Sequence, residues 1–298
     1  GVQALVYRPE IARFRLRRHR LRRLHRKLAL IDGRVAFVGG INVIDDFNSP
    51  HRSSPRYDYA VRVEGPLLVP IQKALRRLWE VVLWARLNRR YRLTRLVEAS
   101  GAARGEQTAA FLVRDNLRHR RDIERAYLDA IGAAREEIVV ANAYFLPGRR
   151  FRRALRVAAG RGVRVTILLQ GLVEYRLLHY ATQALYGNLL AAGIRIFEYQ
   201  RSFLHAKVAV IDRHWATVGS SNIDPFSLLL AREANVVVLD RRFAEELEQS
   251  LAAAMRDGAR ELPADSWQRQ PWYSRLLRRA SYSLLRIFVG ISGYGGKR

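Results

Sequence analysis

The sequence contains no cysteine and a single methionine among its 298 residues. Without cysteine the chain has no disulfide framework, no thiolate metal site and no cysteine nucleophile. Long apolar runs are missing as well, since no stretch of the sequence approaches the roughly 20 apolar residues of a membrane-spanning helix. The chain is long enough to bury a sizeable core as one large or two smaller domains.

Acidic residues are scarce: 27 Asp and Glu face 53 Lys and Arg, which gives a formal net charge of +26. The hydrophobic fraction of 49% excludes a disordered polycation. Such a charge predicts an anionic partner, either nucleic acid or an acidic membrane surface. Lysine is itself rare, and each lysine is a candidate for a site that needs a compact point charge. The four lysines are Lys27, Lys73, Lys207 and Lys297.

Apolar spacing along the chain predicts strands that alternate with helices. This order is typical of an α/β layered fold with a largely buried sheet. The expected strands are 27–32, 35–39, 58–64, 110–114, 137–146, 163–169, 194–199, 206–212, 215–219 and 234–240. The expected helices are 67–87, 120–134, 149–160, 175–192 and 242–256.

An internal repeat is the strongest sign of organisation. Residues 25–42 (HRKLALIDGRVAFVGGIN) and 205–222 (HAKVAVIDRHWATVGSSN) align without gaps, match at nine of eighteen positions and lie 180 residues apart. This period is too long for a solenoid unit. It predicts two pseudo-symmetric α/β/α half-domains with mixed β-sheets, related by a pseudo-twofold axis.

The repeat suggests a division of the chain into four parts. We expect a first half over 1–98, a linker over 99–108, a second half over 109–260 and a basic amphipathic tail over 261–298. The second copy has about ninety residues of strand and helix before its histidine, whereas the first has only 24. We therefore expect the first half to be incomplete at its N-terminus.

Both copies carry the pattern His-x-Lys-x4-Asp. On a strand, residues two apart point to the same face, so each histidine projects beside its lysine. A twofold axis would bring two imidazoles and two ammonium groups around one anion. This suits phosphoryl or phosphatidyl transfer without a metal: one histidine attacks phosphorus, the other is the acid and base, and the lysines stabilise charge. The candidate catalytic residues are His25, Lys27, Asp32, His205, Lys207 and Asp212.

The doubled motif resembles the signature of the phospholipase D superfamily, over nearly the whole chain from residue 22 to about 257. In that family a Gly-Ser or Gly-Gly pair followed by Asn lines the phosphate site. The resemblance thus implies that substrate is bound by Gly40, Asn42, Ser220 and Asn222. Gly40 replaces the usual serine. A carboxylate beyond the Asn orients the histidine ring in many members, which implies Asp58 for the first copy and Glu233 for the second.

Within the superfamily, the sequence is similar to those of bacterial cardiolipin synthases of the short type without N-terminal transmembrane helices. The segments on which this similarity rests are HRKLALIDG, VGGIN, DYAVRVEGP and SSNIDPFS. The resemblance implies transfer of a phosphatidyl group from one phosphatidylglycerol to another, with release of glycerol, through a phosphohistidine. We take His25 as the nucleophile and His205 as acid and base, or the reverse. It further implies a peripheral enzyme on the cytoplasmic face of the bacterial cytoplasmic membrane, with phosphatidylglycerol and cardiolipin as partners and no cofactor.

Two basic segments favour a membrane surface. The run over 13–27 has no acidic residue, and no acid follows Asp265. The tail carries an apolar helical stripe, typical either of an interfacial helix or of a helix docked on the domain. The stripe consists of Tyr273, Leu276, Leu277, Ala280, Leu284, Ile287 and Phe288.

Two other functions fit these observations. A phosphodiesterase that hydrolyses phospholipid or nucleic acid, such as a nuclease, would use the same scaffold, and the net charge of +26 suits DNA. An inactive membrane-binding module would use the basic segments alone. Consumption of labelled phosphatidylglycerol or of plasmid distinguishes the first from the proposed transferase.

Overall fold

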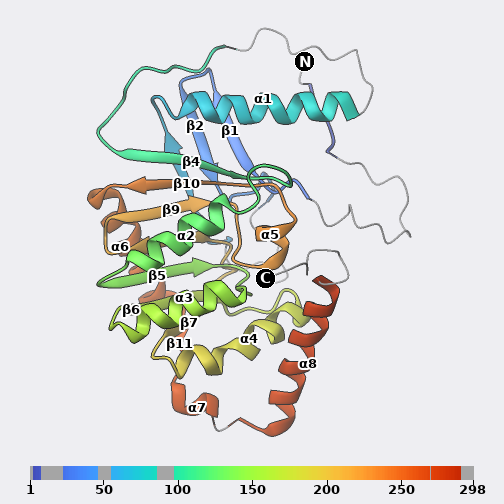
Figure 1. The fold of residues 1–298 in the computed structure, drawn as a ribbon, viewed down its shortest axis with the longest axis vertical. Helices are drawn as coiled ribbons and strands as arrows, with labels where there is room; N and C mark the ends of the chain where they lie inside the picture. The colour runs from blue at the N-terminus through green and yellow to red at the C-terminus, as the bar shows by residue number, and fades with distance from the viewer. Residues whose placement is uncertain (1–2, 8–22, 46–54, 86–96, 269, 290–298) are drawn as a thin grey trace.

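The computed structural model describes residues 3–7, 23–45, 55–85, 97–268 and 270–289 (Figure 1). Most of the basic run over 13–27 therefore lies outside the described residues. The strands are β1 (Lys27–Ile31), β2 (Val35–Gly39), β3 (Ala60–Val63), β4 (Thr108–Arg114), β5 (Glu137–Asn142), β6 (Arg164–Gln170), β7 (Arg195–Tyr199), β8 (Lys207–Ile211), β9 (Trp215–Gly219), β10 (Glu233–Leu239) and β11 (Ala259–Glu261). The helices are α1 (Leu68–Ala85), α2 (Asp122–Ala133), α3 (Arg149–Gly160), α4 (Arg176–Leu190), α5 (Pro225–Leu229), α6 (Arg241–Gly258), α7 (Ala264–Gln268) and α8 (Trp272–Val289).

The strands form one large mixed sheet and one small sheet. The eight-stranded sheet has the order β11-β7-β6-β5-β8-β9-β10-β4, in which β5, β6 and β7 pair in parallel and the other neighbours are antiparallel. The parallel strands are joined through α3 and α4, as crossovers between parallel strands require. The expected α/β fold is confirmed, with a large sheet that is mixed and a small sheet that is wholly antiparallel. The expected strands and helices are present within a few residues of their predicted ends.

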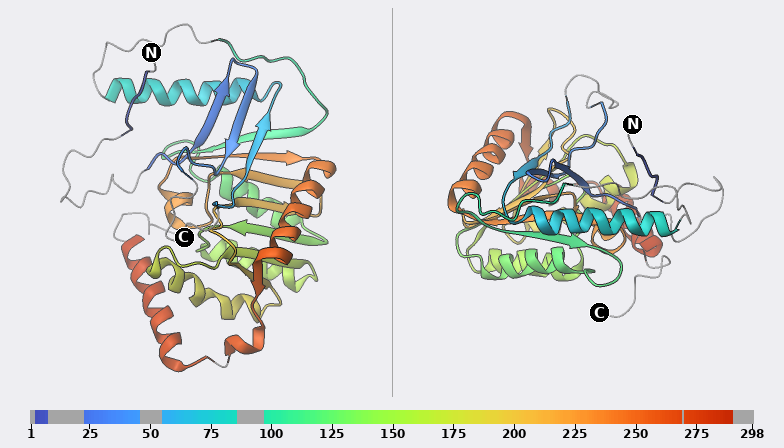
Figure 2. Two further views of the ribbon diagram at one scale, coloured as in Figure 1. Left: turned by 180° about the vertical axis from the view of Figure 1, so that it is seen from behind. Right: turned by 90° about the horizontal axis from the view of Figure 1, so that it is seen from above.

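Alternation along the central strands divides the core between the two faces of the large sheet. Ile138 and Val140 of β5 pack with α2, α3 and α4, whereas Val139 and Ala141 pack with α6. Helices α2, α3 and α4 lie in front of the sheet in Figure 1, and α6 lies in front when the molecule is seen from behind in Figure 2. The second half is therefore a three-layered α/β/α unit.

The small sheet β1-β2-β3 repeats the meander β8-β9-β10. Leu28 of β1 pairs with Val38 of β2, and Val208 of β8 pairs with Val218 of β9. The small sheet packs on one face of the large sheet, where Ala36 and Val38 share a core with Val236 and Val238 of β10 and with the first turn of α1. The two copies of the repeat thus have the same pairing register.

Both hairpins turn through residues with positive φ. Asp32 (φ 50°) and Gly33 (φ 64°) connect β1 to β2, and Asp212 and Arg213 (both φ 50°) connect β8 to β9. Two successive positive φ values are typical of the type I′ turn that suits the twist of a hairpin. Glycine adopts this conformation without strain, and Arg213 is instead held by ion pairs with Glu137 (2.9 Å) and Glu248 (3.0 Å).

The tail forms α8, which packs along α4 at the lower end of the molecule (Figure 1). Ser281 and Leu285 of α8 are buried there, and Arg278 donates to Gln183 of α4. The apolar stripe expected from the sequence faces away from α4, and its large residues are between 45% and 63% exposed. Among the described residues, no helix is both long and apolar enough to span a membrane.

Candidate active site

Each motif histidine lies just before the strand that its lysine begins. Lys27 is the first residue of β1 and Lys207 the first of β8. The Lys27 ammonium donates to the backbone carbonyl of His25 (Nζ–O 2.8 Å), and the Lys207 ammonium donates to that of His205. The lysine of each copy therefore holds the backbone of its own histidine in the same way.

Two parallel bridges bring the copies together. Leu24 pairs with Arg232, and Leu204 pairs with Tyr57. The His25 amide donates to the Arg232 carbonyl (3.0 Å), and the His205 amide donates to the Tyr57 carbonyl (2.8 Å). The residue before each histidine is thus attached to the other half, immediately before a carboxylate. This exchange is the pseudo-twofold relation expected from the repeat.

The two carboxylates are crossed between the halves. His25 Nδ1 lies 3.1 Å from the carboxylate of Glu233, and His205 Nδ1 lies 2.6 Å from Asp58 Oδ2. Each carboxylate therefore contacts the histidine of the other copy, because the bridges exchange the partners. A carboxylate only accepts, so Nδ1 of each ring carries the hydrogen. Each Nε2 is left with the lone pair that attack or proton transfer requires.

Asp58 and Glu233 nevertheless occupy equivalent positions in their sheets. Gly39 of β2 pairs with Ala60, and Gly219 of β9 pairs with Asn235, so each carboxylate stands two residues before the pairing residue. The segment from residue 39 to 60 is five residues longer than the segment from 219 to 235. This insertion accounts for the different spacing of Asp58 in the sequence.

Burial lowers the pKa of every cationic group whose shift is resolved at the centre. Lys207 is fully buried, and burial lowers its pKa to about 7, although Asp58 (Nζ–Oδ2 3.8 Å) raises it. Burial lowers the pKa of Lys27 to about 8 against the opposing influence of Glu233 and Asp58. Burial likewise lowers the pKa of His205, partly offset by its hydrogen bond with Asp58. A bound anion would reverse these shifts, because it favours the charged forms.

Ser220 and Gly40 differ in what they do beside the carboxylates. The Ser220 hydroxyl donates to Glu233 Oε2 (2.6 Å). Gly40 has no such group, and a Cβ placed there would lie 2.3 Å from Asp58 Oδ1. The glycine is therefore required by the close approach of Asp58. It keeps the backbone bond of its counterpart, since the Gly40 and Ser220 amides both donate across to the next strand at 2.9 Å.

The two asparagines lie at the same centre. Asn42 lines a cavity of about 310 Å³ together with Ile41, Arg56, Asp58 and His205. Asn222 is buried, and its Oδ1 has no hydrogen-bond partner among the described residues. A buried amide oxygen without a donor is suited to accept from a bound molecule.

The motif aspartates do not join the histidines. Asp212 lies at the far end of β8 from Lys207, about 16 Å along the strand, where it accepts from the amides of Arg135, Glu136 and Glu137 at 2.8–2.9 Å. Burial alone would raise its pKa, but these donors outweigh burial and hold it below the ordinary value. Asp32 occupies the equivalent turn. Their assignment as catalytic residues is corrected: the structure places them in turns that anchor the hairpins.

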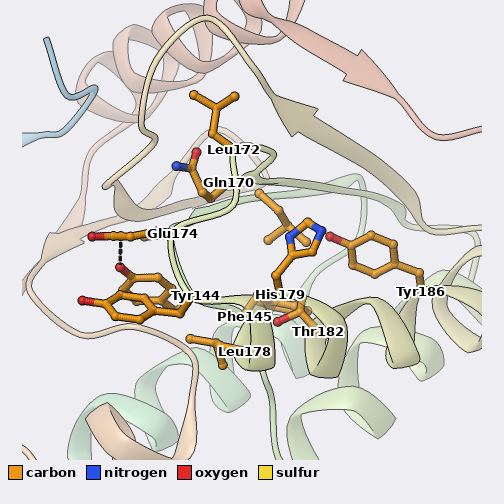
Figure 3. A pocket seen from close by; sticks show the side chains of 12 residues that line it. Tyr144, Phe145, Gln170, Leu172, Glu174, Leu178, His179, Thr182 and Tyr186 are labelled. Carbon is orange, nitrogen blue, oxygen red and sulfur yellow. Dashed lines mark hydrogen bonds between the residues drawn. The ribbon is translucent and has the colours of Figure 1, made fainter. Parts of the chain in front are cut away.

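A second cavity, of about 390 Å³, lies at the ends of β5 and β6 (Figure 3). Its wall includes Tyr144, Gln170, Glu174 and His179, none of which was selected from the sequence. A signal was available: Gln170 is a polar residue at the carboxyl end of a buried strand, and α/β sheets bind ligands at that edge. Within the described ranges, no group of three His, Cys, Asp or Glu side chains is placed to hold a metal ion.

The mixed α/β fold, with two His/Lys half-sites facing each other, defines a protein of the phospholipase D type. The solved structure of phosphatidylserine synthase from Haemophilus influenzae Rd KW20 has this fold, with a TM-score of 0.63 and 13% identity, over 93% of this chain and 70% of that one. A family model described as "Cardiolipin synthase, PLD-like domain" matches residues 127–255.

Comparison with related sequences identifies the family within the phospholipase D type. Cardiolipin synthase B of Escherichia coli (strain K12) is 38% identical over 304 residues, which cover 99% of this chain and 70% of that protein. Cardiolipin synthase A of Pseudomonas entomophila (strain L48) is 32% identical over 82% of this chain and 49% of that protein. The chain belongs to the cardiolipin synthase family.

Proposed function

We propose that this protein is a phosphatidyltransferase that makes cardiolipin from two phosphatidylglycerol molecules through a phosphohistidine and releases glycerol. The observation that carries the proposal is the crossed pair of histidine–carboxylate contacts, His25 with Glu233 and His205 with Asp58. Each contact leaves the Nε2 of its ring for chemistry, and the buried Lys207 and half-buried Lys27 supply positive charge for one phosphate. Kinship with cardiolipin synthases supports an alcohol as the acceptor.

In the first half-reaction, His25 Nε2 attacks the phosphorus of one phosphatidylglycerol. The phosphorus–nitrogen bond forms as the bond from phosphorus to the glycerol headgroup oxygen breaks. His205 gives its Nε2 proton to that oxygen, and glycerol leaves. Lys27 and Lys207 stabilise the charge that develops on the equatorial oxygens.

In the second half-reaction, a headgroup hydroxyl of another phosphatidylglycerol attacks the phosphohistidine. His205 takes the hydroxyl proton, the new oxygen–phosphorus bond forms, and the phosphorus–nitrogen bond to His25 breaks. The product is cardiolipin and His205 is again protonated. The lowered pKa of His205 suits a base near neutral pH, and the anionic phosphodiester supplies the charge that favours its protonated form.

The cavities support this division of roles. The 310 Å³ cavity is lined by His205, and the 390 Å³ cavity adjoins the residues on either side of it. Alcohols that leave and enter on this side of the phosphorus meet His205. Attack from the opposite side then falls to His25.

The test is product formation from labelled phosphatidylglycerol vesicles by His25→Ala and His205→Ala, with the exposed His214→Ala as the matched control. We expect both site variants to lose cardiolipin formation, at least about 10³-fold, and His214→Ala to keep it. Trapping of radiolabel on the protein in the base-stable, acid-labile form of a phosphohistidine should fail in His25→Ala. Full activity of either site variant refutes the mechanism, and consumption of plasmid in place of lipid favours the nuclease. Vesicle binding by a wild-type protein that never forms a phosphohistidine favours the inactive module.

We further propose that the enzyme binds the cytoplasmic face of the bacterial cytoplasmic membrane peripherally, through the exposed face of α8. This face, here called the α8 face, comprises Trp272, Tyr273, Leu276, Leu277, Ala280, Leu284, Ile287 and Phe288. All of them fall within one arc of about 160° at the 100° per residue of a helix. Exposed Arg275, Arg279 and Arg286 flank the arc, so apolar and cationic groups meet an anionic bilayer together.

Co-sedimentation with phosphatidylglycerol vesicles tests the α8 face. The double variant Leu276→Glu/Leu284→Glu should bind at least about tenfold more weakly, because it places two charges where acyl chains are met. The matched control is Leu117→Glu, which alters a leucine that is 76% exposed and lies outside α8. Equal binding by the double variant and the wild type refutes this surface.

A further inference from the structure

The cavity of about 390 Å³ is attached to His205 on both sides. The Ala143 amide donates to the carbonyl of Ala206 (2.9 Å), and the Leu204 amide donates to Gln170 Oε1 (2.9 Å). Ala143 and Gln170 both line the cavity, and Leu204 and Ala206 are the neighbours of His205. We call this cavity, shown in Figure 3, the strand-end pocket, because β5 and β6 end in its wall.

The strand-end pocket contains a buried donor for which the described part of the chain supplies no acceptor. Because Gln170 Oε1 accepts from the Leu204 amide, the orientation of the side-chain amide is fixed. Its Nε2 is buried and has no hydrogen-bond partner among the described residues. Leaving such a group unsatisfied costs about 1–3 kcal/mol, so a ligand oxygen that accepts from it is stabilised by a comparable amount.

An acceptor stands in the same pocket. The Tyr144 hydroxyl donates to Glu174 (Figure 3), and burial raises the pKa of Tyr144 so that this hydroxyl keeps its proton. A carboxylate has about four acceptor positions, so Glu174 can take further hydroxyl donors. The rings of Tyr144 and Tyr175 meet edge to face at 5.9 Å and give the pocket an aromatic side.

This combination selects among the parts of a phosphatidylglycerol molecule. The Glu174 carboxylate repels a phosphate, and an acyl chain would leave Glu174 and Gln170 desolvated without partners. A small neutral polyol satisfies both, because one hydroxyl donates to Glu174 while another accepts from Gln170. The Tyr144 and Tyr175 rings meet its carbon-bound hydrogens.

We propose that the strand-end pocket binds the glycerol headgroup, both as it leaves in the first half-reaction and as it enters on the second phosphatidylglycerol. This inference rests on the proposed phosphatidyl transfer. The leaving and entering alcohols are both glycerol units on the same side of the phosphorus, facing His205, so one pocket serves both. By holding the headgroup hydroxyls, the pocket favours an alcohol over water as the acceptor of the phosphatidyl group.

The test replaces the two polar groups without changing their shape. In Glu174→Gln the carboxylate becomes an amide that still accepts from Tyr144, and in Gln170→Glu the orphan donor is lost while Oε1 still accepts from Leu204. Tyr144→Phe is a milder third variant that removes only the hydroxyl. The matched control is Glu136→Gln, at an exposed glutamate outside the pocket.

Cardiolipin and phosphatidic acid are measured as products from phosphatidylglycerol vesicles, and the KM for glycerol is measured in the reverse reaction with cardiolipin. We expect Glu174→Gln and Gln170→Glu to form cardiolipin roughly 10- to 100-fold more slowly, because each loses a hydrogen bond to the headgroup, one of them charged. The share of phosphatidic acid, the product of transfer to water, should rise. In the reverse direction, the KM for free glycerol with cardiolipin should rise while transfer to water persists. Glu136→Gln should match the wild type.

Two results overturn the pocket. In the first, the three variants keep the wild-type ratio of cardiolipin to phosphatidic acid and the wild-type KM for glycerol. In the second, both products fall equally, which marks a purely structural role. Failure of the proposed function looks different, because the wild type would then form neither product from phosphatidylglycerol.

Discussion

The two copies of the meander have the same register in very different surroundings. Ile31, at the end of β1, is 50% exposed, whereas its counterpart Ile211 at the end of β8 is 3% exposed. Yet both copies present a histidine and a lysine in the same way. The hairpin register and the type I′ turn are local properties, and they give both half-sites the same arrangement although the burial of their strands differs.

The carboxylate positions show a complementary exchange. Asp58 has one methylene fewer than Glu233 and lies so close to residue 40 that only glycine fits there. Glu233 reaches further and is met by the hydroxyl of Ser220. The aspartate beside a glycine and the glutamate beside a serine are thus two ways to hold a histidine ring in place.

The largest expected effect comes from breaking the crossed contacts. We expect Glu233→Gln and Asp58→Asn each to lower kcat about 10²- to 10⁴-fold, because the amide no longer fixes the histidine tautomer. NMR of the imidazole nitrogens decides which ring each acid controls. Glu233→Gln should change the His25 signals, and Asp58→Asn those of His205. The reverse assignment would contradict the crossing.

The next effect probes the difference between Gly40 and Ser220. In Gly40→Ser the new Cβ displaces the Asp58 carboxylate from His205, so kcat/KM should fall roughly 10- to 100-fold. Ser220→Gly removes one hydrogen bond to Glu233 and should cost roughly tenfold or less. Steady-state kinetics on phosphatidylglycerol vesicles measure both. If Gly40→Ser is the milder change, the halves do not differ in the way described.

A stability difference is expected between the motif aspartates. Asp212→Ala leaves three backbone amides without their acceptor and should lower the free energy of unfolding by about 1–3 kcal/mol. The Asp32 side chain accepts no hydrogen bond in the part of the chain that the structure describes, so Asp32→Ala should cost less than about 1 kcal/mol. Urea unfolding measures both. Loss of activity in folded Asp212→Ala at low urea would restore a catalytic role.

The smallest expected effect is the pH dependence of anion binding, which distinguishes Lys207 from Lys27 by their pKa values. The pKa of Lys207 is about 7 and that of Lys27 about 8. Above these values the free protein loses the protons, whereas bound sulfate favours the ammonium forms. Sulfate binding should therefore take up protons above these pKa values. The affinity for sulfate should fall as the pH rises, by up to roughly tenfold per pH unit for each lysine. The same shift means that the cost of burying Lys207 charged falls as pH rises from about 7 towards its ordinary pKa, so its contribution to stability rises.

Calorimetry in buffers of different ionisation enthalpy measures the proton uptake. Lys207→Gln should remove the component that begins near its pKa of about 7, and the exposed Lys73→Gln should leave the profile unchanged. Sulfate affinity that stays flat across this range would contradict the lowered pKa values.

The sequence was most informative where interactions are local. The repeat placed His25 and His205 at equivalent positions beside two strands, because the same motif recurs in the same register. Which histidine each carboxylate meets could not be predicted, because the parallel bridges of Leu24 with Arg232 and Tyr57 with Leu204 leave no periodic signal. A contact between residues about 150–200 positions apart depends on how two sheets meet, which no local pattern encodes.

The pocket residues were missed for a different reason. Gln170 and Tyr144 stand at strand ends, where single polar residues are common and usually solvated. Only the burial of the Gln170 amide and the hydrogen bond from Tyr144 to Glu174 distinguish them. For the motif aspartates the prediction failed in the opposite direction. Their place in the signature suggested a catalytic role, although Asp212 accepts hydrogen bonds from backbone amides.

The crossed carboxylates have a consequence for how the chain can be altered. A chimera that takes one half from a relative inherits a histidine tuned to an acid that it no longer meets, so the halves must be exchanged as a matched set. Intragenic suppressors follow the same geometry. Substitutions that rescue a defect at Asp58 should cluster near His205, and those that rescue Glu233 near His25.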